Sequence, residues 1–334
     1  MKQFAPIMHH FFLTFAAGIY AGLLKIHRFL RSFYRPIHLP YPVISIGGLS
    51  LGGDGKTPVV QYLAQYLNQK GYKVVVLTRG YKGQQKGPLW VQENDTAQQV
   101  GDEALMLYRS LKERHIPVCI SQNLFKLPAF FKAHPLPSNT IILWDNGHQN
   151  PYLHKNLRVL VVNNTYGFGN KHLFPAGPLK QSLKTGLSQT DLILCLKNPS
   201  DSLHPDIPSH LPRVFMTPQE TCPLPTGTEV YAFCGLGRPQ AFYQSLQNYG
   251  YILKECRSFS DHHPYTLEDE QELLKQAFLL QVPLITTLKD EVKLSDAFKK
   301  KVTLFQRNLH WTDLKNEEIF CNILKSLVSF KKRH

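Results

Sequence analysis

The stretch VISIGGLSLGGDGKT, residues 43–57, decides the fold of this chain. It begins as a buried apolar strand and runs into a glycine-rich turn that ends in Gly-Lys-Thr. Such a turn between a strand and a helix is typical of a phosphate-binding P-loop, because glycine lets several backbone N–H groups point at one oxyanion. We therefore predict nucleotide binding here; the alternative is a plain strand–helix turn.

The residue types of this turn suit phosphate chemistry. We expect Lys56 to reach the terminal phosphates and the Thr57 hydroxyl to hold Mg²⁺. The next helix is predicted to begin near Pro58 and to point its positive end at the phosphates. The strict motif has glycine five residues before Gly55, where this chain has serine. The residues expected to bind the nucleotide are Ser50, Leu51, Gly52, Gly53, Asp54, Gly55, Lys56 and Thr57.

Composition describes an ordinary globular protein with an unusual charge. The 334 residues are 43% hydrophobic and 19% charged, a length that suggests about two domains. The net charge of +14 implies a polyanionic partner, which is nucleic acid, anionic lipid or a phosphorylated substrate. We expect no nucleic-acid partner, because the basic residues are spread along the chain without a recognised binding motif.

The six cysteines are scattered and form no CxxC pair. This spacing argues against a disulfide framework or a zinc site and fits the reducing cytosol. We expect each of them to be a small buried hydrophobic residue.

The N-terminal segment narrows the choice of anion. Residues 11–24 are apolar, and Lys25, Arg28, Arg31 and Arg35 follow at once. The apolar run is too short to cross a bilayer, since a spanning helix needs about twenty residues. A signal peptide would place its charges before the run. We expect an amphipathic anchor in a cytoplasmic leaflet; the alternative is a helix packed on the domain.

The rest of the chain alternates apolar strands with helices. Strands are expected over 73–81, 117–121, 139–145, 158–163 and 192–197, and helices over 58–70 and near 101–114. This order predicts an α/β fold with a mainly parallel, doubly wound sheet of the P-loop NTPase kind. Ligands of such sheets gather at the carboxyl ends of the strands.

Seven prolines between residues 198 and 225 predict a connector without regular structure. The strand–helix pattern then restarts, with strands at 229–235, 252–256 and 283–287 and helices from 239 and over 266–280. The expected division is an N-terminal interfacial helix with its basic flank (1–35), a P-loop domain (36–197), the connector (198–225) and a smaller α/β domain (226–334).

Three acidic or histidine positions are candidates for chemistry. Asp145 closes an apolar strand, where P-loop enzymes hold a carboxylate that orders Mg²⁺ or its waters; the alternative is an Asp that starts a turn. Asp102 opens a predicted helix and has a simple cap as its alternative. Asp261, His262 and His263 follow a strand, and an Asp beside a His can set up proton transfer.

Together these motifs resemble those of the tetraacyldisaccharide 4'-kinase family, the lipid A kinases of Gram-negative bacteria. The resemblance covers nearly the whole chain, and it rests on the order and spacing of many motifs. They are GGDGKTP (52–58), TRGYKG (78–83), GDEA (101–104), WDNGHQN (144–150), GFGNKHLFPAGPLK (167–180), AFCGLGRPQAF (232–242), SDHHPY (260–265) and TTLKDEVKL (286–294).

The resemblance implies a reaction and its setting. The γ-phosphate of ATP would pass, with Mg²⁺, to the 4'-hydroxyl of a tetraacyldisaccharide 1-phosphate, giving lipid IVA in lipid A biosynthesis. The protein would be peripheral or monotopic at the cytoplasmic face of the bacterial inner membrane.

The resemblance also implies roles for residues. Asp102 would be the general base, with His262, or with less support His263, orienting or tuning it. Arg79 and Tyr81 match active-site positions of the family. Lys56 would act on the phosphates, and Thr57 and Asp145 would serve the metal.

Several positions depart from the family pattern as we know it. Asn146 stands where a second aspartate is usual, and it brings no negative charge to the metal. His148, Asn150 and Gln181 also differ, as does the position near Gln122. We expect an active kinase.

Two further classes stay open. A P-loop GTPase or metallochaperone-type switch would recognise guanine with Asn/Thr-Lys-x-Asp, but here Lys289 directly precedes Asp290. Selection of GTP over ATP would favour that class. A catalytically weakened membrane-peripheral homologue would bind lipid in a nucleotide-dependent way without phosphate transfer.

Overall fold

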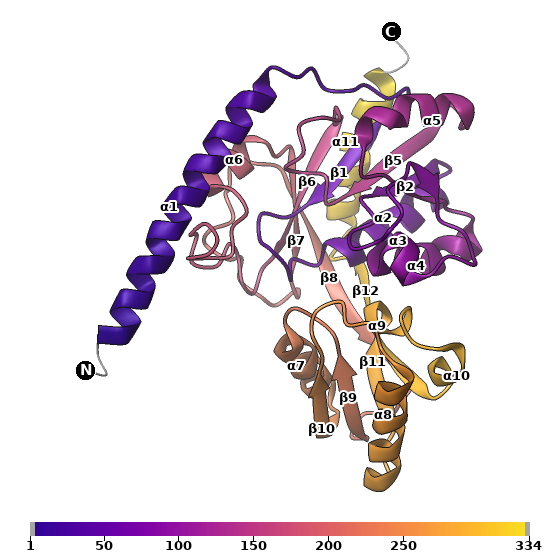
Figure 1. Cartoon of the computed structure of the whole chain (residues 1–334). Coiled ribbons are helices and arrows are strands. Elements are labelled where there is room, and N and C mark those ends of the chain that lie inside the picture. The colour runs from indigo at the N-terminus through magenta and orange to yellow at the C-terminus, as the bar shows by residue number, and fades with distance from the viewer. Residues whose placement is uncertain (1–3, 331–334) are drawn as a thin grey trace.

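The structure, a computed structural model, describes residues 4–330. Its described strands form one twelve-stranded sheet that runs through the molecule (Figure 1). All neighbouring pairs are parallel except β12–β8 and β3–β4, as a mainly parallel fold predicts. The strand order is β10 (Ile252–Ser258), β9 (Glu229–Cys234), β11 (Leu284–Thr287), β12 (Val302–Trp311), β8 (Arg213–Thr221), β7 (Leu192–Leu196), β6 (Leu157–Asn163), β1 (Val43–Gly47), β5 (Thr140–Asp145), β2 (Lys73–Thr78), β4 (Val118–Ile120) and β3 (Leu89–Trp90).

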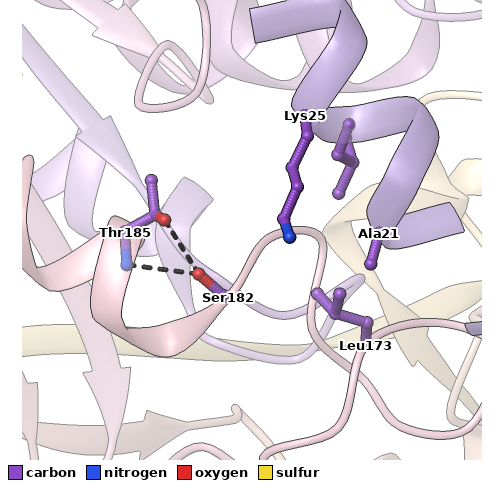
Figure 2. Close-up of a pocket in the computed structure, with 6 residues that line it drawn as sticks. Ala21, Lys25, Leu173, Ser182 and Thr185 are labelled. Atoms are coloured by element: carbon purple, nitrogen blue, oxygen red, sulfur yellow. Dashed lines mark hydrogen bonds between the residues drawn. The ribbon is translucent and has the colours of Figure 1, made fainter. Parts of the chain in front are cut away.

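The helix α1 (Phe4–Ser32) is longer than the predicted apolar run and lies along one side of the molecule (Figure 1). One face packs on the protein: Ala17 is buried, and the Tyr20 hydroxyl donates to the backbone oxygen of Lys180 at 3.0 Å. Figure 2 shows Ala21 and Lys25 of this helix beside Leu173. Within residues 4–330, no helix combines the length and apolar character needed to span a bilayer.

The opposite face of α1 is apolar and exposed. It carries Phe15, Ile19, Leu23, Ile26 and Leu30, and Phe33 follows directly after the helix; each of these is more than half exposed. These positions recur every three or four residues, so they form one stripe along the helix. We call these six residues the α1 stripe. One face of the helix is thus packed on the domain, and insertion of the exposed face into a membrane stays a prediction.

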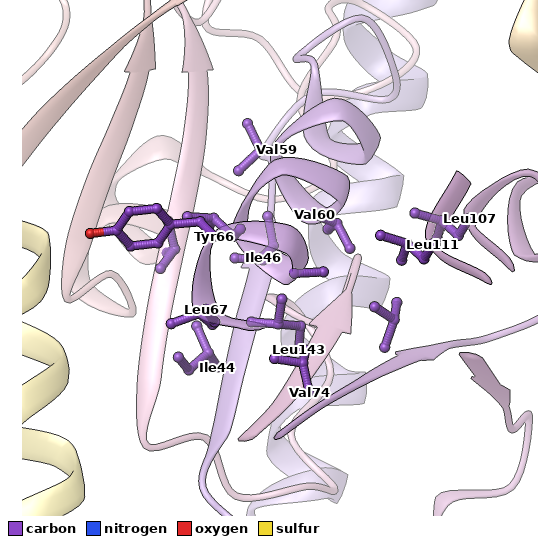
Figure 3. Close-up of a cluster of buried hydrophobic side chains, with 14 of the residues drawn as sticks. Ile44, Ile46, Val59, Val60, Tyr66, Leu67, Val74, Leu107, Leu111 and Leu143 are labelled. Atoms are coloured by element: carbon purple, nitrogen blue, oxygen red, sulfur yellow. The ribbon is translucent and has the colours of Figure 1, made fainter. Parts of the chain in front are cut away.

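Helices cover both faces of the P-loop unit, by which we mean β1 to β8 and the helices between them. Ile44 and Ile46 of β1 point to one face, against α2 (Lys56–Gln69), α4 (Asp102–Leu111) and α11 (Leu314–Phe330) (Figure 3). Val43 points to the other face, against α5 (Leu127–Ala133). This alternation follows from the two-residue period of a strand and confirms the doubly wound arrangement. Two short helices, α3 (Ala97–Val100) and α6 (Leu183–Ser188), complete the unit.

The C-terminal unit repeats this arrangement around β9, β10 and β11. Alternate residues of β9 again face opposite ways: Val230 packs with α7 (Pro239–Tyr249) and Tyr231 with α8 (Leu267–Leu280). Two short helices, α9 (Leu288–Glu291) and α10 (Asp296–Lys299), follow β11. This unit lies beyond the carboxyl end of the P-loop unit's strands (Figure 1).

The strand β12 joins the two units. Its first residues run parallel to β11 and its last six run antiparallel to β8. The chain then returns through α11, whose Phe320 and Leu324 enter the core of the P-loop unit. The predicted four-part division stays a prediction; we propose that α11 belongs with the P-loop domain.

One expectation is wrong: residues 198–225 are not free of regular structure, because β8 lies within them. Its pairing with β7 ends at Met216, and beyond that point it pairs with β12 alone. Pro218 lies in this second part, so its missing N–H interrupts no bond to β7. Pro218 therefore lies within the strand without interrupting its pairing with β7, and the other six prolines of residues 198–225 lie outside it.

Candidate active site

The P-loop connects β1 to α2 in the predicted way. The backbone torsion φ is +82° at Gly53 and +81° at Gly55, in the left-handed region that glycine adopts without steric cost. The helix begins at Lys56, two residues before the predicted start. The Leu51 N–H donates to the Pro178 carbonyl at 2.9 Å, so the loop before α6 braces the turn.

Lys56 lies at the mouth of this turn. Its ammonium is 3.1 Å from a carboxylate oxygen of Asp54, and its side chain is 14% exposed. The ion pair holds the ammonium beside the turn, where a phosphate would compete for it. Thr57 follows in the first turn of α2.

Asp145 ends β5 beside the strand that feeds the P-loop, in register with Ile46. Burial first, and then the charge of Glu103, raise the pKa of Asp145 to about 7, while Lys56 lowers it. A buried carboxylate of this kind is stabilised by a cation, so the donor set of Asp145 and Thr57 fits Mg²⁺. Across residues 4–330, no group of three or more His, Cys, Asp or Glu side chains is arranged to hold a metal. The remaining ligands would therefore be phosphate oxygens and water.

Asn146 occupies the position of the expected second carboxylate. Its N–H donates to the Ile46 carbonyl at 2.8 Å, and its Oδ1 accepts from Lys180 Nζ at 3.3 Å. Burial first, and then the charge of Lys56, lower the pKa of Lys180 to about 8. A lysine thus faces the uncharged amide, a contact that the motif around residue 180 did not predict.

Asp102 and His262 are brought together from the two units. Asp102 is the first residue of α4, and Gly101 holds the cap position, so Asp102 is not the cap. Its Oδ2 lies 2.7 Å from His262 Nδ1, and its Oδ1 accepts from the Glu103 N–H at 2.9 Å. Both side chains are under one tenth exposed. A carboxylate–imidazole pair of this geometry can move a proton.

The charge state of Asp102 follows from its neighbours. Burial by itself raises the pKa of Asp102, but the hydrogen bond and charge of His262, with Lys289, bring it below the ordinary value. Asp102 is therefore ionised at neutral pH and able to accept a proton.

Lys289 contacts the other nitrogen of His262. Its Nζ lies 3.4 Å from Nε2 and 3.1 Å from an oxygen of Asp261. In the neutral form of His262, Nε2 can accept from this ammonium, and the Nδ1 proton then points at Asp102. This contact was not predicted from the sequence, in which Lys289 was part of the motif TTLKDEVKL (286–294) and of the comparison with the guanine-recognition pattern.

The other predicted residues differ in how close they lie to the Asp102–His262 pair. The Tyr81 ring lies 5.5 Å from the His262 ring, and Tyr81 is 56% exposed. His263 points elsewhere, with Nε2 3.0 Å from Asp269. Arg79 is exposed just after β2, and no ion pair among the described residues joins it to Asp102 or His262. The geometry favours His262 over His263 and leaves the role of Arg79 a prediction.

A buried aspartate anchors the loops that carry His262. Asp290 is fully buried and accepts four hydrogen bonds, of which the Gly235 N–H gives one at 2.9 Å. The His262 N–H in turn donates to the Gly235 carbonyl at 3.2 Å. The other donors to Asp290 are the Tyr265 hydroxyl, the Thr287 hydroxyl and Lys293 Nζ. The loop at residues 235–238 and the His262 loop are thus held as one piece.

A cavity of about 360 Å³ lies between α1 and the segment of residues 173–185. Its lining is mostly apolar at Ala21, Leu24 and Leu173, with Lys25, Ser182 and Thr185 at its border (Figure 2). Lys180, which faces Asn146, also binds Tyr20 of α1 through its backbone. The cavity is therefore linked to the Asp145 end of the site by a short piece of chain.

Comparison with known proteins gives consistent matches. Residues 9–327 match the family described as Tetraacyldisaccharide-1-P 4'-kinase. A protein of Gluconobacter oxydans (strain 621H) is 32% identical over 326 residues, which are 95% of this chain and 97% of the relative. One of Jannaschia sp. (strain CCS1) is 37% identical over 275 residues, 80% of this chain and 81% of the relative. Both are named tetraacyldisaccharide 4'-kinase.

A solved structure is also similar. It is the crystal structure of the "apo" form of LpxK from Aquifex aeolicus in complex with ATP, and it superposes with a TM-score of 0.69. The two chains are 26% identical, and the match covers 92% of this chain and 96% of the other.

Proposed function

This chain belongs to the tetraacyldisaccharide-1-P 4'-kinase family. From this premise we propose which role each of its site residues has in an ATP-dependent phosphoryl transfer. The acceptor is the lipid A precursor, a tetraacyldisaccharide 1-phosphate, and the product is lipid IVA. The observation that carries the proposal is the 2.7 Å contact of Asp102 with His262 across the two units.

In the proposed reaction, one bond forms and one bond breaks. The 4'-oxygen of the acceptor forms a bond to the γ-phosphorus of ATP, and the bond from that phosphorus to the β–γ bridging oxygen breaks. Its electron pair leaves with ADP, and the acceptor proton passes to Asp102. His262 orients Asp102 and keeps it ionised until the proton arrives.

The P-loop backbone and Lys56 hold the phosphates and neutralise their charge. Thr57 and Asp145 would hold Mg²⁺, which supplies further neutralisation of the phosphate oxygens when bound. Little covalent chemistry is asked of the protein in such a reaction, so positioning supplies most of the rate. The roles of Arg79 and Tyr81 belong to this proposal through their motif, with Tyr81 beside His262.

We propose that the lipid part of the acceptor lies at α1. Acyl chains need an apolar surface, and the cavity beside Leu24 and Leu173 offers one close to the phosphate site. The α1 stripe would enter the cytoplasmic leaflet of the inner membrane, with the exposed Lys25 and Arg35 near anionic headgroups. An amphiphilic substrate then reaches the site without leaving the membrane surface.

The test is an in vitro assay with ATP, Mg²⁺ and labelled tetraacyldisaccharide 1-phosphate. The intact chain is expected to form the 4'-phosphorylated product, and Lys56→Ala is expected to lose at least about 100-fold in kcat. Selection of GTP over ATP would instead support a switch protein. Nucleotide-dependent lipid binding without any transfer would support a weakened homologue.

A further inference from the structure

An arginine from the C-terminal unit lies against the P-loop. A methyl group built on Gly53 would be 3.1 Å from Nη1 of Arg238 and 3.6 Å from its Cζ. Arg238 is the residue before α7, so it reaches the phosphate-binding turn from the far unit. Gly53 is part of the backbone that would surround the nucleotide phosphates, and the guanidinium therefore lies beside the turn that is expected to hold them.

The backbone around Arg238 is fixed. The Gly235 N–H binds the buried Asp290, and the His262 N–H binds the Gly235 carbonyl. Pro239 follows Arg238 as the first residue of α7 and restricts the chain at that point. Arg238 and His262 are thus carried by two loops that share one anchor, and the geometry that brings His262 to Asp102 also brings Arg238 to Gly53.

The charge of Arg238 is not taken up by a carboxylate. It is an exposed residue, and none of the ion pairs among residues 4–330 includes it. Two lysines of the site form ion pairs with other residues: Lys56 pairs with Asp54, and Lys289 pairs with Asp261. The Arg238 guanidinium thus lies beside a phosphate-binding turn and forms no ion pair with a protein carboxylate. Its N–H groups can therefore donate hydrogen bonds to a phosphate oxygen.

We propose that Arg238 is a catalytic residue that donates hydrogen bonds to the transferring γ-phosphoryl group. The inference rests on the proposed function. Charge shifts onto the γ-phosphoryl and bridging oxygens as the acceptor bond forms and the bridging bond breaks, and Arg238 neutralises it. Arg238 gives up no proton, because the acceptor proton passes to Asp102 and the electron pair leaves with ADP.

Kinetics of four proteins test the proposal: the intact chain, Arg238→Ala, Arg238→Lys and Arg257→Ala. The control arginine lies on β10 and pairs with Glu272 at 2.8 Å. We expect Arg238→Ala to lower kcat on the order of 100-fold or more, with the KM for ATP changed by less than about threefold. Arg238→Lys should recover no more than about a tenth of the lost rate, because a lysine lacks the planar fork. Arg257→Ala should keep normal kcat.

A binding measurement separates catalysis from mere bracing of the P-loop. Mg·ADP with aluminium fluoride mimics the planar transferring group, whereas Mg·ADP alone does not. Arg238→Ala should weaken binding of the mimic on the order of 100-fold and leave Mg·ADP binding unchanged. Thermal melting with and without Mg·ADP shows whether each variant is folded.

Two results would overturn the assignment. One is a kcat for Arg238→Ala within about threefold of the intact chain. The other is an equal loss of affinity for Mg·ADP and for the mimic, which would make Arg238 a structural brace. If the intact chain transfers no phosphate, the proposed function fails instead, while the binding measurement still decides whether Arg238 meets the phosphoryl position.

Discussion

Nδ1 of His262 lies 2.7 Å from Oδ2 of Asp102, although 160 residues separate them in the chain. Asp102 comes from the helix α4 of the P-loop unit, and His262 comes from a loop of the C-terminal unit. Neither unit holds the pair alone. The relative placement of the units is therefore part of the chemistry, and the strand β12, which pairs with strands of both units, joins them.

Removal of the charge of Lys289 should shift the pH dependence of turnover. Lys289 lowers the pKa of Asp102, so Lys289→Met raises that pKa and leaves less Asp102 ionised at a given acidic pH. The acidic limb of the kcat–pH profile is expected to move to higher pH. Lys275→Met, an exposed position on α8, serves as the control and should leave the limb in place. An unmoved limb in Lys289→Met would show that Lys289 does not act on the pair.

Loss of Asp290 should destabilise the protein and impair the site together. Asp290→Ala removes the acceptor of four buried donors, one of them Lys293, and this should cost about 3–5 kcal/mol in the free energy of unfolding. Urea unfolding measures it. Asp296→Ala, whose carboxylate is 96% exposed, is the matched control and should change stability little. Equal stability of the two variants would refute the anchoring role.

The P-loop, the parallel strands before residue 197 and the α1 segment could be predicted, because each is encoded locally. Gly53 and Gly55 supply the left-handed turn, and the strand patterns are short and apolar. Asp102, His262 and Asp145 were found through their motifs, since a motif preserves the spacing that a shared fold imposes.

The rest depends on contacts that no local pattern carries. β8 was not predicted because it contains Pro218 and lies in the proline-rich segment 198–225, and β12 contains Gln306, Arg307 and Asn308, which a buried strand would not have. β12 tolerates them because these three residues are not fully buried. The approach of Arg238 to Gly53 and of Lys180 to Asn146 joins distant segments, so only the folded chain shows them.

A second carboxylate at position 146 should strengthen the metal site. Asn146→Asp keeps a residue that tolerates the observed φ of +56°, and Lys180 at 3.3 Å offsets the added repulsion. The Mg²⁺ concentration for half-maximal rate is expected to fall about tenfold, because ligand charge sets the affinity of such sites. Titration of the initial rate with Mg²⁺ measures it. An unchanged or higher requirement would mean that residue 146 does not serve the metal.

Charges in the α1 stripe should weaken membrane binding. The double variant Ile19→Asp, Leu23→Asp replaces two exposed apolar side chains, each of which contributes about 1.5–3 kcal/mol when buried. Binding to vesicles that contain anionic phospholipid should fall about 100-fold or more, because two such burials contribute at least about 3 kcal/mol. Phe278→Asp, 83% exposed on α8, is the control. The α1 assignment is wrong if both proteins sediment with vesicles as the unaltered chain does.

The most direct test of the central claim is phosphate transfer by Asp102→Asn. The variant keeps the shape of the side chain but cannot take the acceptor proton, so kcat should fall by about 100-fold or more while the affinity for Mg·ATP stays the same. Transfer of labelled γ-phosphate to tetraacyldisaccharide 1-phosphate, beside calorimetric binding of Mg·ATP, measures both quantities. Near-normal turnover of Asp102→Asn would contradict the account.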